Sequence, residues 1–165
     1  MKKIIPFTTL CILLIIIVRP LFTPTILGSA DGLAHKFRVV SFANSLTQGN
    51  FRPRWLADEA MGYGSAIFLF NYLLPYYAIS LLILIGIGIK TATQIYLAFT
   101  VVSSGIAMYL LVQTLWGKRA SVVASIAYAA APYHLLSVYI YEGWGEATAF
   151  IFPPLILYLT LKLID

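Results

Sequence analysis

Apolar residues occur in long blocks along this chain of 165 residues, and polar residues gather between the blocks. The first block runs over residues 4–18, and four more follow at 66–89, 91–116, 120–141 and 147–164. A helix needs roughly 20 apolar residues to cross a bilayer, and backbone polar groups in lipid must be satisfied within the segment. The pattern therefore predicts an all-α membrane protein with four to five transmembrane helices in a single membrane domain.

One long polar stretch, residues 28–65, separates the first block from the others. Its apolar positions predict an amphipathic helix that begins at Asp31, ends at Gly49 and lies in the membrane interface, with one side formed by Leu33, Phe37, Val40 and Leu46. No small-x-small cleavage site follows the first block, and Arg19-Pro20 interrupts the chain there. We therefore expect an uncleaved N-terminal anchor helix at 1–27 and an outer amphipathic, juxtamembrane helical loop at 28–65.

The block at 66–89 is expected to be an interfacial or re-entrant helix. Pro75 removes a helical hydrogen bond, and tyrosines beside it favour the membrane interface, namely Tyr72, Tyr76 and Tyr77. Residues 91–165 would then form three transmembrane helices.

Basic residues leave three topologies open. With five spans and the N-terminus inside, Lys118-Arg119 faces outward, against the positive-inside tendency. An N-terminus outside places more basic residues on the cytoplasmic side, but it requires translocation of Lys2-Lys3. The third arrangement keeps the N-terminus inside and leaves 66–89 at the outer face. We predict that Lys118-Arg119 is cytoplasmic and that residues 142–146 lie outside, as in the second and third arrangements.

Composition excludes a soluble domain. Hydrophobic residues make up 61% and charged residues 10% of the chain, against about 45–50% and 25% in soluble domains. No basic stretch is long enough to bind nucleic acid, and the single Cys11 forms no disulfide within the chain. Membrane lipid is the expected partner and the cell membrane, crossed several times, the expected location. The oligomeric state is left open.

Two acidic clusters are candidates for chemistry, because charge near a bilayer is costly and usually functional. Asp31 and His35 are one helical turn apart and suit a general base, although Asp31 also suits a helix N-cap. Glu142 and Glu146 lie between two apolar blocks, where an ordinary loop with a helix-capping acid is the alternative. Two ligands are too few to predict a metal site.

Basic side chains between 28 and 65 suit phosphate, Arg through its bidentate fork, and they comprise Lys36, Arg38, Arg52 and Arg54. Attraction to lipid headgroups is the alternative. The sequence shows no phosphate loop, no dinucleotide pattern and no serine or cysteine nucleophile with its base, so no cofactor is expected.

The order of short motifs resembles a known family. The motifs are DGLAH at 31–35, GNFRPRW at 49–55, GYG at 62–64, FNYLLPYY at 70–77, GKR at 117–119, APYH at 131–134 and YEGWGEA at 141–147. The chain is similar to the N-terminal part of multispanning proteins labelled "membrane protein, 6-pyruvoyl-tetrahydropterin synthase-related". These resemble lipid-dependent glycosyltransferases of the GT-C type and YfhO-like proteins. Such families are much longer, so we expect this chain to be a fragment of a longer domain.

The resemblance implies an enzyme that takes a sugar from a polyprenyl-phosphate donor at the outer membrane face. Asp31 matches the acidic residue that serves as catalytic base, and Glu142 or Glu146 matches a second outer acidic site. Arg52 and Arg54 would hold the donor phosphate. The same motifs place further substrate-binding residues at His35, Trp55 and Tyr72. The alternative function is a non-catalytic membrane protein, either a lipid or solute carrier or an assembly subunit.

Overall fold

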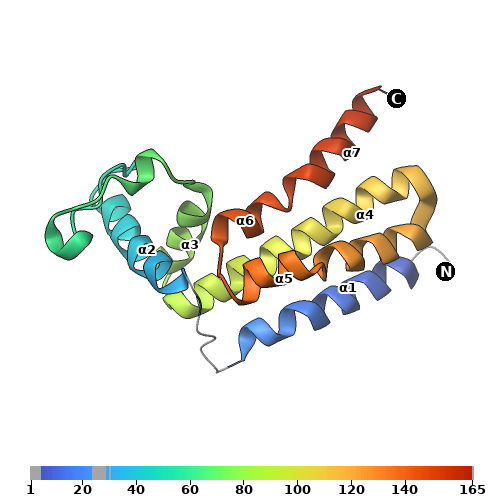
Figure 1. The fold of residues 1–165 in the computed structure, drawn as a ribbon, viewed down its shortest axis with the longest axis horizontal. Helices are drawn as coiled ribbons and strands as arrows, with labels where there is room; N and C mark the ends of the chain where they lie inside the picture. Colours follow the sequence, from blue (N-terminus) through green and yellow to red (C-terminus); the bar gives the residue numbers. More distant parts are fainter. Residues whose placement is uncertain (1–4, 24–28, 30, 165) are drawn as a thin grey trace. The chain divides into compact units, whose positions relative to one another are not determined.

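A computed structural model describes residues 5–23, 29 and 31–164, and Figure 1 shows the helices that they form. The described elements are α1 (Ile5–Val18), η1 (Arg19–Phe22), α2 (Gly32–Thr47), η2 (Ala60–Gly62), η3 (Ile67–Leu69), α3 (Leu74–Leu84), α4 (Ile89–Ala129), α5 (Pro132–Tyr139), α6 (Trp144–Ala149) and α7 (Phe152–Ile164). The all-α class is confirmed. The parts of the expected anchor and loop at 1–4, 24–28 and 30 lie outside the described residues, as does residue 165.

The chain divides into two compact units, which are treated separately here. One comprises the described residues up to 23 together with 97–164, and the other comprises 29 and 31–96.

In the first unit, α1 packs closely on α4. A Cβ atom added at Gly105 would lie only 2.8 Å from Leu14 Cδ2, so the missing side chain allows the two helices to approach. Phe7 meets Tyr109 edge to face with ring centroids 6.0 Å apart, and the Tyr139 hydroxyl donates to the Ile17 carbonyl. Small residues at helical spacing thus serve packing, as expected for helices that approach closely.

α4 is longer than one span and is interrupted. Its 41 residues correspond to about 62 Å of helix, and Gly117 leaves the helical region with φ 80° and ψ −179°. The next expected span, 120–141, is likewise two helices. Ala131 is extended, with ψ 138°, and α5 begins at Pro132, because a residue before proline avoids the helical conformation.

Two of the described helices are long and apolar enough to cross a membrane, Ile89–Ala129 and the run Trp144–Ile164 formed by α6 and α7. This is fewer than the four to five spans expected from the apolar blocks. In the second run, only 17% of the most apolar 18-residue stretch is buried inside the protein. Such an exposed apolar helix suits a lipid environment better than water.

In the second unit, α2 packs on α3 through a buried face that comprises His35, Val39, Phe42, Ala43 and Leu46. The expected helix is present, but the predicted apolar side was wrong in part. Leu46 is buried, whereas Leu33, Phe37 and Val40 are exposed. α2 carries two apolar stripes, and only the structure shows that α3 covers the one through Phe42.

The block at 66–89 contains η3 and α3 rather than one continuous helix. α3 has 11 residues, or about 16 Å of helix, well short of the roughly 30 Å of a hydrocarbon core. Pro75 lies in the first turn of α3, where a missing N–H costs nothing, so it starts the helix and does not interrupt it.

Candidate functional site

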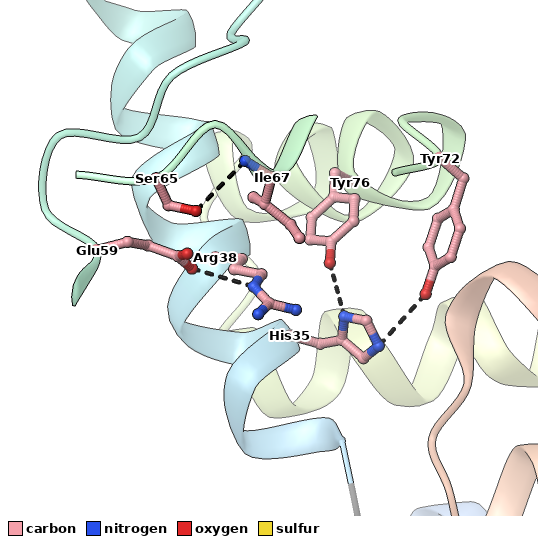
Figure 2. Close-up of polar contacts among 7 residues, drawn as sticks. All are labelled: His35, Arg38, Glu59, Ser65, Ile67, Tyr72 and Tyr76. Atoms are coloured by element: carbon pink, nitrogen blue, oxygen red, sulfur yellow. Dashed lines mark hydrogen bonds and ion pairs between the residues drawn. The ribbon is translucent and has the colours of Figure 1, made fainter. Parts of the chain in front are cut away.

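The second unit contains a buried polar cluster around His35, shown in Figure 2. The Tyr76 hydroxyl lies 2.6 Å from His35 Nδ1, and the Tyr72 hydroxyl lies 3.3 Å from His35 Nε2. His35 comes from α2, whereas Tyr76 comes from α3 and Tyr72 from the turn before it. His35 is 5% exposed and Tyr76 fully buried, but Tyr72 is 38% exposed. The cluster therefore runs from the interior of this unit to its surface.

An ion pair lies beside His35 and the two tyrosines. Arg38 donates from Nε to Glu59 Oε1 at 3.1 Å. A neutral imidazole has one donor and one acceptor nitrogen, so one tyrosine hydroxyl donates to His35 and the other accepts from it.

Burial favours the neutral forms of both buried partners. Burial and then the nearby Arg38 charge hold the pKa of His35 below its usual value, while Asp31 acts in the opposite direction. Burial likewise raises the pKa of Tyr76 above that of an ordinary phenol. The cluster is therefore uncharged at His35 near neutral pH. It can orient a hydrogen-bonding group, whereas a cationic imidazole acid is disfavoured.

Asp31 occupies the N-cap position of α2, but its side chain makes no capping hydrogen bond. Ser29 Oγ instead accepts from the Gly32 N–H at 2.9 Å. Asp31 is therefore the N-cap residue that the alternative named, but its carboxylate does not cap the helix. Asp31 is exposed and one turn from His35, as the spacing predicted. A role as catalytic base stays a prediction.

Arg52 and Arg54 line one hollow of about 330 Å³ together with Phe68, Leu69 and Leu73. Both arginines are exposed, and the chain near them is held by the Tyr77 hydroxyl, which donates to the Phe51 carbonyl. Two cations and three apolar side chains in one lining suit an anionic headgroup joined to a hydrocarbon chain. Arg38, in contrast, pairs with Glu59 within the fold, and its suitability for phosphate stays a prediction.

The second acidic cluster lies in the first unit. Glu142 is half-buried, with a left-handed φ of 49°. Glu146 lies in the first turn of α6, is exposed, and accepts a hydrogen bond from Ser137 Oγ at 2.9 Å. An acid in the first turn suits the helix dipole. Because Asp31 belongs to the other unit, the predicted shared cavity of Asp31 with these glutamates stays a prediction.

Trp55, another predicted substrate-binding residue, is 55% exposed. Its indole ring packs over Gly64, where an added Cβ would overlap it. The Trp55 ring is thus packed against the backbone at Gly64. Trp55 directly follows Arg54, which lines the hollow. Among the described residues, no group of three potential metal-ligating side chains gathers at one place.

Three polar residues of interest were not predicted as site residues. Glu59 and Tyr76 complete the His35 cluster, and only the general rule that a buried phenol needs a partner pointed to Tyr76. His134 is fully buried in the first unit, with Nδ1 3.2 Å from the Tyr128 carbonyl. Its Nε2 has no hydrogen-bond partner among the described residues. An orphaned buried nitrogen of this kind is uncommon.

Comparisons with protein families, curated proteins and solved structures give no significant match. The functional argument therefore rests on the residues themselves.

Proposed function

We propose that this chain is a multi-pass protein of the cell membrane that binds a phosphate-linked lipid at the hollow beside Arg52 and Arg54. The lining of this hollow carries the proposal: Arg52 and Arg54 line it together with the apolar residues Phe68, Leu69 and Leu73. The guanidinium forks match phosphate oxygens, and the apolar side chains match the first carbons of a lipid chain. The candidate spans Ile89–Ala129 and Trp144–Ile164 provide the apolar helices that such a location requires.

The fuller proposal is a lipid-dependent glycosyltransferase of the GT-C type that uses a polyprenyl-phosphate sugar donor at the outer membrane face. Asp31 would accept the proton of the acceptor hydroxyl, and Glu142 or Glu146 would orient substrate. Exposure of Asp31 leaves its carboxylate accessible to an acceptor. The neutral His35 and the partly exposed Tyr72 would add hydrogen bonds to sugar hydroxyls.

Binding of a polyprenyl phosphate to the purified protein in detergent tests the first step. The double variant Arg52→Gln/Arg54→Gln should bind on the order of tenfold to a hundredfold more weakly. The reason is that a charge-assisted hydrogen bond contributes about 1.5–3 kcal/mol and 1.4 kcal/mol is a factor of ten. Arg119→Gln, at an exposed position of the other unit, is the matched control. Equal binding of the neutral polyprenol, or unchanged binding by the double variant, would refute the phosphate site.

A non-catalytic lipid carrier or assembly subunit is the second candidate. The observation that favours it is the burial of His35, the imidazole nearest in sequence to Asp31, between two tyrosine hydroxyls. Asp31→Asn separates the two functions. Transfer of sugar from lipid donor to acceptor should stop in the variant of an enzyme, whereas a carrier should retain both lipid binding and its cellular role.

A further inference from the structure

Residues 56–65 form a hydrogen-bonded hairpin in the second unit. Leu56 and Ser65 exchange two backbone hydrogen bonds of 2.9 Å. The Glu59 carbonyl closes the turn by accepting from the N–H groups of Gly62 and Gly64, at 3.1 and 2.9 Å. The turn is therefore closed by backbone hydrogen bonds within the hairpin.

The tip of hairpin 56–65 is strained and apolar. Ala60 and Met61 have φ values of 51° and 60°, in the left-handed region that side chains disfavour. Met61 is fully exposed and Tyr63 is 86% exposed. Figure 1 shows this segment projecting beyond α2 and α3 within its unit. Strained backbone that presents large apolar side chains is a feature expected of a contact surface.

The chemistry around hairpin 56–65 matches a phospholipid headgroup layer. Tyrosine and tryptophan favour the level of the headgroups, and Trp55 directly precedes the hairpin. Arg52 and Arg54 lie immediately before it and complement anionic lipid phosphates. Asp58, exposed on the first arm, limits the depth, because a carboxylate is costly in hydrocarbon.

We propose that hairpin 56–65 docks on a bilayer that contains anionic phospholipid, with Met61 and Tyr63 entering the headgroup layer. The inference rests on the membrane location in the proposed function, but it needs neither catalysis nor the polyprenyl phosphate. It assigns a lipid surface as the partner of the tip. A second protein on the tip is the competing outcome.

The test uses the full chain with Cys11→Ser, reconstituted in vesicles of phosphatidylcholine and phosphatidylglycerol in equal amounts. A nitroxide is attached at Met61→Cys, and Gln48→Cys, a polar exposed position after α2, is the control. Power-saturation EPR compares collisions with oxygen, which partitions into lipid, and with a neutral nickel chelate, which stays in water. The Met61 label should show a higher ratio of oxygen to nickel collisions than the Gln48 label.

Each outcome decides the inference. A higher oxygen-to-nickel ratio at Met61 that disappears when the protein is moved to lipid-free amphipol supports docking on lipid. A ratio equal to that of Gln48 would show that the tip lies in water and would overturn it. Protection from both relaxants would indicate a protein contact and would also overturn it. Either failure leaves phosphate binding by Arg52 and Arg54 intact, so the two proposals fail separately.

Discussion

The Tyr76 hydroxyl should stabilise the second unit more than any other single group of the His35 cluster. Tyr76→Phe removes only the oxygen that meets His35 Nδ1 at 2.6 Å in a fully buried setting. Loss of a hydrogen bond to a buried group costs about 1–3 kcal/mol. We therefore expect the free energy of unfolding of this unit to fall by roughly 2 kcal/mol.

Tyr72→Phe is the matched control for this prediction. Its hydroxyl lies 3.3 Å from His35 Nε2, and Tyr72 is 38% exposed. The hydrogen bond is longer, and water can reach its position. Loss of this hydroxyl should therefore cost below about 1 kcal/mol.

Native-state hydrogen exchange of α2 and α3 measures the effect, because it reports the opening of these helices directly. At neutral pH, protection of the α2 amides should fall about thirtyfold in Tyr76→Phe, since roughly 2 kcal/mol corresponds to that factor. In a His35→Leu background the same change should cost less, because the hydrogen-bond partner of the Tyr76 hydroxyl is gone. Equal protection in Tyr76→Phe and Tyr72→Phe would refute the assignment of the short, buried hydrogen bond as the dominant one.

Three further predictions use other features of the chain. Because burial lowers the pKa of His35 in the fold from its ordinary value of 6.5, the unfolded chain binds the proton more readily. The stability from neutral His35 is then complete above pH 6.5 and lost as the pH falls below it. Exchange of α2 amides between pH 7.5 and 5 checks this after correction for intrinsic rates, and a His35→Gln variant should lose the dependence. Gly64→Ala should destabilise more than Gly62→Ala, by about 1–3 kcal/mol in denaturant titrations. Both glycines have positive φ, but only the Gly64 substitution would overlap the Trp55 ring; equal losses would contradict this. In a Cys11→Ser background, a cysteine at Lys118 should react only with a permeant reagent, and labelling by an impermeant reagent from outside would contradict the cytoplasmic assignment.

The pattern of blocks predicted the helical class because helix formation in an apolar segment is a local property. Long runs without charge must satisfy their backbone groups within the run. The boundary between the blocks at 91–116 and 120–141 also appears in the structure, because Gly117 interrupts α4 there. The number of spans was overestimated for a related reason. Length and hydropathy do not register a single proline, and Pro132 divides the block at 120–141.

The candidate site was predicted only in part. The motif around Asp31 and His35 and the pair Arg52 and Arg54 were singled out from residue type and spacing alone. The structure adds that the two arginines line one hollow and that Arg38 forms an ion pair with Glu59. Residue types indicate which side chains can bind phosphate, but not which of them already have a partner.

The sequence by itself determined the helical class and the placement of polar residues at the ends of apolar blocks, because both depend on contiguous residues. Tertiary structure decided which stripe of α2 is buried, since Leu33 and Phe42 are equally apolar and only packing on α3 distinguishes them. It also decided the state of His35, because Tyr76 lies 41 residues away in the chain. Spacing along one helix relates His35 to Asp31, whereas its shortest hydrogen bond comes from another helix.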